Sequence, residues 1–179
     1  MCIRDRFNTT TKLTDTISDH FAGDLQGKRI AVWGCTDING DWDEATTKTV
    51  DWLLAQGVEV AIHDSTLSAN DIATQFGDHV SAPVKQWDAV KSADAVIVCS
   101  DLACYCSIDA GRLAWSLTER VLFDVHGTIN RDSLQYSSFA HYVLSKSSTD
   151  ESGVTMSVRI DSAFPSTQNQ GETFFANAG

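Results

Sequence analysis

The chain has 179 residues, of which 42% are hydrophobic and 21% are charged, a composition typical of a globular protein with one sizeable core. Its 13 Lys and Arg residues against 24 Asp and Glu residues give a net charge of -11 at pH 7, which argues against partners such as nucleic acid or an anionic membrane. No stretch approaches the roughly 20 apolar residues of a membrane span, and the start lacks the layout of a secretory signal, so we expect a cytoplasmic protein.

The beginning of the chain carries two different signals. Residues 1–6, MCIRDR, resemble the translation of a transposase adapter used in sequencing libraries, and we interpret them as an artefact ahead of a truncated chain. The next segment, 7–21, places apolar residues at steps of four, which predicts an amphipathic helix. A Gly-containing turn then leads into a continuous apolar run at 28–34, KRIAVWG, which is typical of a central parallel strand.

Helices and strands are predicted to alternate from there to about residue 145. Asp41 and Glu44 have capping-box spacing, which predicts a helix that begins there and stops at Gly57. The remaining strands are expected at 58–64, 94–100, 121–125 and 141–145, and the remaining helices near 70–76, 84–91, 108–117 and 130–135. This alternation predicts an α/β fold: a three-layer Rossmann-like domain with a mostly parallel sheet, preceded by one helix and followed by a loosely ordered tail.

The loop after the first strand is the main candidate for function. It joins Gly34 to a capped helix, the arrangement in which backbone amides meet an anion. Gly34 and Gly40 are six residues apart, however, without the intermediate glycine of a dinucleotide fingerprint. Asp64 ends the next strand, where a Rossmann domain often presents an acid to a ribose, although a turn former is at least as good an interpretation. These residues predict binding of a nucleotide-like anion rather than turnover.

Other chemistries find little support in the sequence. Cys104 and Cys106 have no further ligands at metal-binding spacing nearby, so a metal site is not expected, and the cysteines are interpreted as reduced thiols. No serine occupies a nucleophile elbow and no cysteine lies beside an evident base. The histidines lie in separate segments without metal-type pairing: His20, His63, His79, His126 and His141.

Several blocks of the chain agree in order and spacing with one known family. They are GDLQGKRIAVWG, DWDEA, VDWLLAQGVEVAIHD, ADAVIV, SDLACYCSID and LFDVHGTINRDSLQ. From residue 8 to about residue 145 the chain resembles the C-terminal, UDP-binding domain of the UDP-glucose/GDP-mannose dehydrogenase family. The resemblance implies part of an NAD-dependent oxidoreductase of polysaccharide biosynthesis, UDP-glucose 6-dehydrogenase-like, which oxidises C6 of a nucleotide sugar.

The resemblance also implies a longer protein in which different domains carry different functions. NAD would be bound by a missing N-terminal domain, a central helical domain would form the homodimer, and the catalytic cysteine would lie upstream, so no catalytic residue is expected in this chain. Residues 7–26 would end an inter-domain helix, 27–146 would form the UDP-binding domain, and 147–179 would be a polar tail with a candidate edge strand at 154–160.

For the ligand, the resemblance implies a UDP-sugar or related nucleotide sugar and a set of substrate-binding positions. The family carries a Lys where Thr36 falls here, an Arg where Asp43 falls, and Asp-Gly-Arg where this chain has Asp124-Val125-His126. Losing the two of these cations that the family uses on the ligand, the Lys at Thr36 and the Arg at His126, would remove roughly 1.5 to 3 kcal/mol each and weaken affinity by about two to four orders of magnitude. The expected substrate-binding residues are Gly34, Cys35, Thr36, Asn39, Asp41, Asp124 and His126.

Two alternatives belong to other functional classes. The domain could be a degenerate structural or oligomerisation module that no longer binds nucleotide sugar, with Trp33, Trp42 and Trp52 as packing residues. It could also be an unrelated receiver-like or flavodoxin-like domain, in which Asp37 with Asp41 would suggest Mg²⁺.

Overall fold

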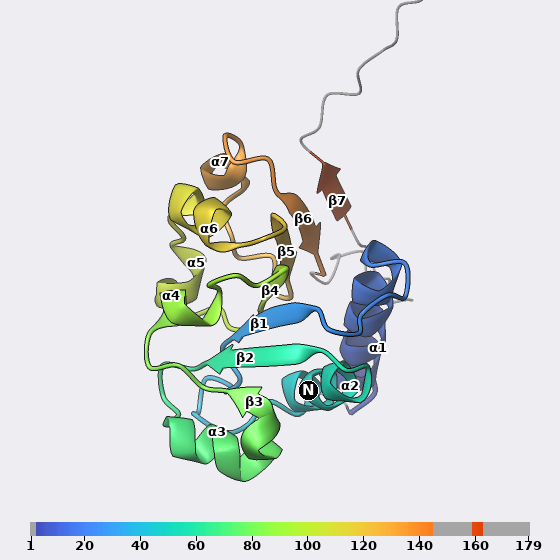
Figure 1. Ribbon diagram of the computed structural model, residues 1–179, viewed down its shortest axis with the longest axis vertical. Helices are drawn as coiled ribbons and strands as arrows, with labels where there is room; N and C mark the ends of the chain where they lie inside the picture. The colour runs from blue at the N-terminus through green and yellow to red at the C-terminus, as the bar shows by residue number, and fades with distance from the viewer. Residues whose placement is uncertain (1–2, 145–158, 163–179) are drawn as a thin grey trace, which may run out of the picture.

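The computed structural model describes residues 3–144 and 159–162 of the chain, and the expectations for the rest of the 147–179 tail lie outside these residues. Figure 1 shows one helix followed by strands that alternate with helices. The strands are β1 (Arg29–Trp33), β2 (Glu59–His63), β3 (Val80–Ser81), β4 (Ala95–Val98), β5 (Val121–Asp124), β6 (Ala140–Val143) and β7 (Arg159–Ser162). The helices are α1 (Ile3–His20), α2 (Glu44–Ala55), α3 (Ala69–Phe76), the 3-10 turn η1 (Gly77–His79), α4 (Gln86–Ala89), α5 (Ala103–Cys106), α6 (Ala110–Ser116) and α7 (Arg131–Leu134).

The strands form one sheet in the order β3-β2-β1-β4-β5-β6-β7. Every neighbouring pair from β3 to β6 is parallel, and β7 pairs antiparallel with β6. The prediction of a Rossmann-like α/β fold with a mostly parallel sheet is therefore confirmed. The edge strand begins at Arg159, near the end of the segment 154–160 in which it was expected.

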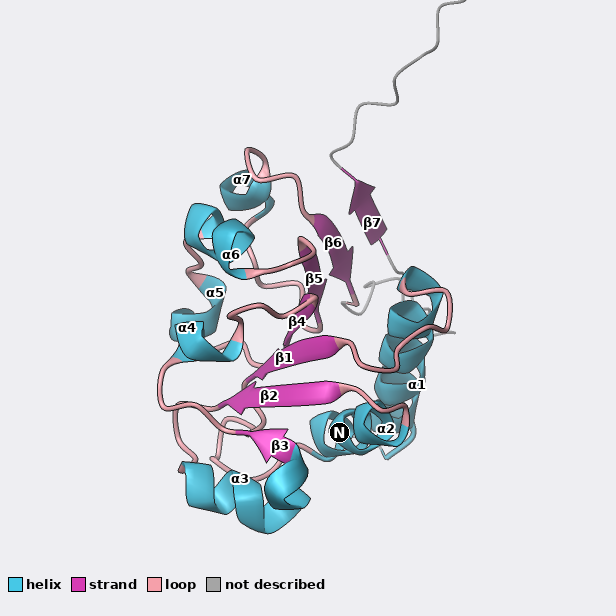
Figure 2. Ribbon diagram, in the orientation of Figure 1, coloured by secondary structure: helices cyan, strands magenta, loops and turns pink. Residues whose placement is uncertain are grey.

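Helices cover both faces of the sheet (Figure 2). Successive residues of a strand point to opposite faces, so the apolar strands place apolar side chains on both faces and each face needs a cover. On one face, Ile30, Val32, Ile97 and Phe123 pack in a buried cluster with residues of α1, α2 and α3. On the other face, Trp33 packs in a second buried cluster with residues of α4, α5, α6 and α7. The continuous apolar runs of the sequence thus supply two cores, one on each side of the sheet.

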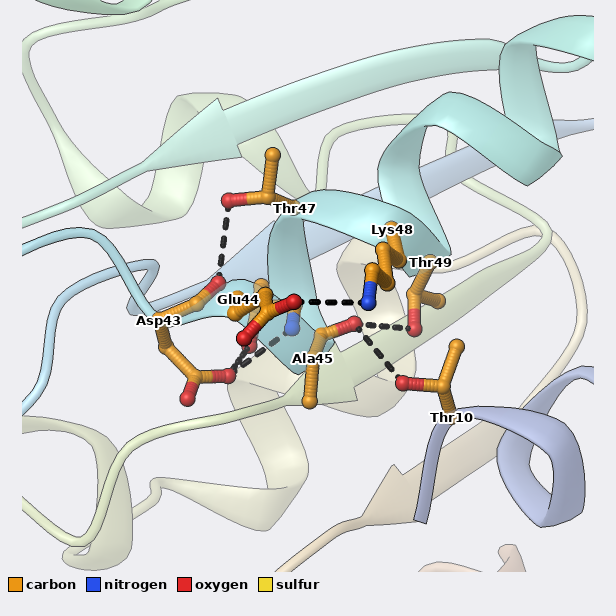
Figure 3. A network of polar contacts seen from close by, with 8 residues as sticks. Thr10, Asp43, Glu44, Ala45, Thr47, Lys48 and Thr49 are labelled. Atoms are coloured by element: carbon orange, nitrogen blue, oxygen red, sulfur yellow. Dashed lines mark hydrogen bonds and ion pairs between the residues drawn. The ribbon is translucent and has the colours of Figure 1, made fainter. Parts of the chain in front are cut away.

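The boundary of α2 differs from the sequence prediction. Asp43, not Asp41, caps the helix: its backbone is extended and its carboxylate accepts the Thr46 amide at 2.8 Å. Asp41 lies in the preceding turn, where its amide donates to the Asp37 carboxylate. Figure 3 shows this helix start together with Thr10 of α1, whose hydroxyl donates to the Ala45 carbonyl oxygen at 3.4 Å. Both acids suit a cap by residue type, and the Thr46 contact explains why the second one takes that role.

Three further elements depart from the expected boundaries. The helix expected at 84–91 spans only α4, because Lys85 is still extended at φ -108° and ψ 132°. The short strand β3 and the single turn α5 were not predicted, since each has too few residues to show a period. The first helix begins at Ile3, within the segment interpreted as adapter-derived, whose origin stays a prediction.

Candidate functional site

The C-terminal ends of the parallel strands lie along one side of the sheet, which we call its carboxyl edge. A topological switch point, where the chain connections diverge to opposite faces, lies there between β1 and β4. β1 and β4 lie side by side and parallel, yet the chain leaves β1 for α2 on one face and leaves β4 for α5 and α6 on the other. In open α/β sheets, the diverging loops at such a point are where ligands bind. The loops that follow β1, β4 and β5 at this edge carry most of the predicted site residues.

Gly34 brings the loop after β1 into close contact with the loop after β4. Its φ is +81°, and a Cβ atom placed on it would lie 2.3 Å from the Ser100 Cβ atom. Its amide donates to the His63 carbonyl oxygen at 2.9 Å. Only glycine meets both the backbone conformation and the close approach, so the structure explains why a glycine ends this strand.

Asp64 organises the loop after β1 from the end of β2. The carboxylate is buried and accepts hydrogen bonds from four backbone amides and two hydroxyl groups, those of Cys35, Thr36, Thr66 and Leu67. Burial alone would raise the pKa of Asp64, but hydrogen bonds from the Cys35 amide, Thr66 and Thr36 hold it below its usual value. Asp64 is therefore a loop-organising residue with its oxygens already engaged, in line with the turn-former interpretation.

The predicted site residues in this loop fall into two groups. The amides of Cys35 and Thr36 donate to Asp64, at 2.6 and 3.1 Å. Asn39 and Asp41 are exposed at the tip of the loop, where both of their amides donate to the Asp37 carboxylate. The amides expected to meet an anion thus bond to the chain's own carboxylates in this structure.

Asp124, at the end of β5, organises the loop after β5 as Asp64 organises the loop after β1. It is fully buried, and its two carboxylate oxygens accept the amides of Gly127 at 2.8 Å and Ile129 at 2.9 Å. Burial would raise the pKa of Asp124, but the nearby His141 ring and hydrogen bonds from the loop amides hold it below its usual value. Asp124 shapes the loop that carries His126, and its carboxylate does not face solvent.

His126 is the predicted site residue that links two neighbouring loops. Its Nε2 atom lies 2.9 Å from the Cys99 carbonyl oxygen, so this nitrogen carries a proton and donates it. Cys99 directly precedes Ser100, which contacts Gly34. The structure therefore brings Gly34 and His126 to the same edge of the sheet through two consecutive residues of the loop after β4.

Cys35 and Cys99, the two buried cysteines near this edge, are poorly suited to act as nucleophiles. Burial raises the pKa of the Cys35 thiol well above its usual value and raises the pKa of the Cys99 thiol to about 12. Cys104 is exposed on α5, and the Cys106 sulfur lies 3.1 Å from the Thr128 hydroxyl oxygen. Since the thiolate is the reactive form, the two buried cysteines are packing residues.

Three residues that help to form this edge were not predicted from the sequence. Tyr105 of the unpredicted helix α5 is fully buried, and its hydroxyl lies 3.0 Å from His63 Nδ1. Ser100 supplies the surface against which Gly34 packs. His141 lies beside Asp124, with its Nε2 atom 3.6 Å from Asp124 Oδ2. The apolar neighbours of Tyr105 and His141 in the sequence signalled burial but not these polar partners.

Within residues 3–144 and 159–162, no three His, Cys, Asp or Glu side chains are grouped so that they could hold a metal ion, and none of the helices could serve as a membrane span. A depression of about 450 Å³ lies at the opposite, amino edge of the sheet, lined by His20, Glu119, Arg120, Val121, Ser138 and Ala140.

One family model matches part of this chain. Residues 43–131 match the family model described as the UDP-glucose/GDP-mannose dehydrogenase family, UDP binding domain. Among curated proteins, none matches this chain in sequence.

Solved structures with a similar fold include three dehydrogenases. A UDP-glucose dehydrogenase from the hyperthermophilic archaeon Pyrobaculum islandicum has 14% identity and a TM-score of 0.57, and the match covers 75% of this chain and 29% of that one. An NDP-N-acetyl-D-galactosaminuronic acid dehydrogenase from Methanosarcina mazei Go1 has 17% identity and a TM-score of 0.57, over 75% of this chain and 28% of that one. A UDP-D-ManNAc dehydrogenase from Pyrococcus horikoshii has 14% identity and a TM-score of 0.57, over 75% of this chain and 29% of that one. This chain matches less than a third of the length of each protein, and at these identities the likeness concerns the fold.

Proposed function

Residues 43–131 belong to the UDP-binding domain of the UDP-glucose/GDP-mannose dehydrogenase family, and on that premise we propose that this chain binds the nucleotide part of a nucleotide sugar. The observation that carries the proposal is the switch point between β1 and β4, where Gly34, Ser100 and the loop of His126 meet at the carboxyl edge. A ligand at this edge would lie over the loops after β1, β4 and β5, the positions at which open α/β sheets bind nucleotides.

The proposal extends to a longer protein that contains this domain. Such a protein would be an NAD-dependent nucleotide-sugar 6-dehydrogenase of the cytoplasm, active as a homodimer, with NAD bound by a domain outside this chain. The names of the three similar dehydrogenases support this extension, since all of them act on nucleotide-linked sugars or sugar derivatives.

The electrostatics of the edge predict weak binding. Asp37, Asp41 and Asp43 lie in the loop after β1, and Thr36 stands where the family has a Lys. A pyrophosphate approaching this loop meets negative charge, and the amides of Cys35 and Thr36 already donate to Asp64. Two missing charge-assisted hydrogen bonds would cost about two to four orders of magnitude in affinity, so we expect weaker binding than in a domain that keeps both cations.

Isothermal titration of the full chain with UDP-glucose and with UDP tests the proposal. We expect a weak saturable heat for both ligands, and added salt should not weaken it, because salt screens the repulsion between the phosphate groups and the acids of this loop. Glu119→Gln at the opposite edge of the sheet is a matched control and should leave the titration unchanged. The absence of heat from both ligands at millimolar concentration would contradict the proposal.

The hydrogen bonds that the Asp64 carboxylate accepts from the loop after β1 favour a second candidate function. In this view the Asp64 carboxylate has replaced the ligand phosphate at the Cys35 and Thr36 amides, and the domain serves as a structural or oligomerisation module. Sedimentation velocity with and without UDP separates the two candidates. Self-association that UDP leaves unchanged supports the module, whereas a monomer that binds UDP contradicts it.

A further inference from the structure

A buried acid and a buried imidazole face one another between β5 and β6. The side chains of Asp124 and His141 are 0% and 4% exposed, and His141 Nε2 lies 3.6 Å from Asp124 Oδ2. His141 Nε2 has no solvent contact and no hydrogen bond within the usual distance limit. Buried polar atoms seldom lack a hydrogen-bond partner, so the position of His141 Nε2 beside the Asp124 carboxylate needs an explanation.

The Asp124 carboxylate, which is an acceptor, determines which nitrogen of the His141 ring carries a proton. A bare Nε2 lone pair aimed at the Asp124 carboxylate would place two acceptors together, whereas an Nε2–H group faces it favourably. At 3.6 Å the contact is longer than an ordinary hydrogen bond, so the attraction is mainly electrostatic. Because the surroundings are buried, such an interaction is screened less than it would be at the surface.

The same carboxylate determines the course of the loop that follows β5. Asp124 Oδ1 accepts the Gly127 amide and Asp124 Oδ2 accepts the Ile129 amide, which fixes the turn on both sides of Thr128. His126 lies inside this turn and donates to the Cys99 carbonyl oxygen. Any change in the orientation of the Asp124 carboxylate therefore changes the placement of His126.

We propose that His141 is a positioning residue: through its Nε2–H group it holds the Asp124 carboxylate in the orientation that shapes residues 125–129 and sets His126 at the carboxyl edge. The relevance of His126 to a nucleotide sugar rests on the proposed function, whereas the coupling from His141 to the loop does not. His141 itself is buried and contacts no ligand.

The tautomer of His141 can be measured in the unmodified protein. Long-range ¹H–¹⁵N NMR correlations distinguish a protonated Nε2 from a bare one. We expect Nε2 of His141 to carry a proton at neutral pH. A neutral ring protonated only at Nδ1 would overturn the proposal without the need for any variant.

A pair of substitutions separates the donor from the volume of the side chain. His141→Gln retains an N–H donor near the position of Nε2, whereas His141→Leu fills similar space without a donor. In His141→Leu we expect the Gly127 and Ile129 amides to exchange about tenfold faster or more, and the His126 ring resonances to shift. His141→Gln should retain most of the protection and the shifts of the wild type.

The outcomes distinguish this proposal from the proposed function. Equal behaviour of the Gln and Leu variants, or unchanged exchange in both, would overturn the positioning role. If the wild type binds neither UDP nor UDP-glucose, the proposed function fails, while amide exchange still decides the role of His141. If UDP binds, its affinity should fall about tenfold in His141→Leu and be largely retained in His141→Gln.

Discussion

The Asp64 carboxylate lies 2.6 Å from the Cys35 amide nitrogen, so the residue that follows β2 holds the loop that follows β1. These two residues are 29 positions apart in the sequence and meet only because their strands are neighbours. The contact ties the loop after β1 to the end of β2 and engages an amide that could otherwise face an anion.

Replacing Asp64 by alanine should destabilise the fold. The carboxylate serves several buried donors at once, and leaving them unpaired should lower the free energy of unfolding by about 2 to 4 kcal/mol. Asp64→Asn should also lose stability, because its amide group would face backbone N–H donors. Urea denaturation measures both changes. Asp51→Ala, at an exposed position of α2, is the control and should alter stability by less than about 0.5 kcal/mol. A loss at Asp64 as small as that at Asp51 would refute its organising role.

Gly34→Ala should be far more harmful than Gly40→Ala. Both glycines have positive φ, +81° and +83°, but a Cβ on Gly34 would lie 2.3 Å from the Ser100 Cβ while Gly40 has nothing within 4 Å. The left-handed backbone costs each variant about 1 to 2 kcal/mol, and the clash should add roughly 1 to 3 kcal/mol to Gly34→Ala alone. Thermal denaturation of the pair measures the difference, and equal losses would show that the contact with Ser100 is not tight.

Stability should fall in two stages as the pH is lowered. Burial lowers the pKa values of His20 and His63 below 6.5, so the unfolded chain takes up their protons first and stability declines as the pH falls below 6.5. The pKa values of Asp64 and Asp124 are held below 3.8, so their contribution is present above 3.8 and is lost as the pH falls through their lower folded values. Urea midpoints measured across this range test both stages. A midpoint that rises from pH 7 to pH 5 would contradict the first stage.

His126→Arg should strengthen binding of UDP. The resemblance to the family implies an Arg at this position, and a guanidinium can donate charge-assisted hydrogen bonds to a phosphate. A gain of 1.5 kcal/mol or more corresponds to at least about tenfold in affinity. His126→Gln, which adds no charge, is the control for the change in shape. Titration calorimetry compares the two variants, and equal affinities would argue against a phosphate near residue 126.

The sequence predicted the parts of the fold that depend on local patterns. The apolar runs at Arg29–Trp33 and Ala95–Val98 are buried on both faces, which is why they signalled central parallel strands. The start of α2 was misplaced by two residues because Asp41 and Asp43 are equally good caps by type, and only the contact with Thr46 decides between them.

The polar contacts at the carboxyl edge could not be predicted in the same way. Asp64 meets Cys35, and Asp124 meets His141, because strands distant in the sequence are adjacent in the sheet. A short acid at a strand end is compatible with binding a ligand, capping a helix or holding a neighbouring loop. The choice among these depends on which donors the fold brings within reach.

The most direct test of the central claim is a map of amide chemical-shift changes as UDP is titrated into the ¹⁵N-labelled chain. Binding at the switch point should produce saturable shifts at Gly34, Ser100 and Gly127, on the three loops of the carboxyl edge. The amino edge around Glu119 and Ala140 should remain unchanged. Shifts confined to the amino edge, or no shifts at millimolar UDP, would contradict the claim that this chain binds a nucleotide at the switch point of its sheet.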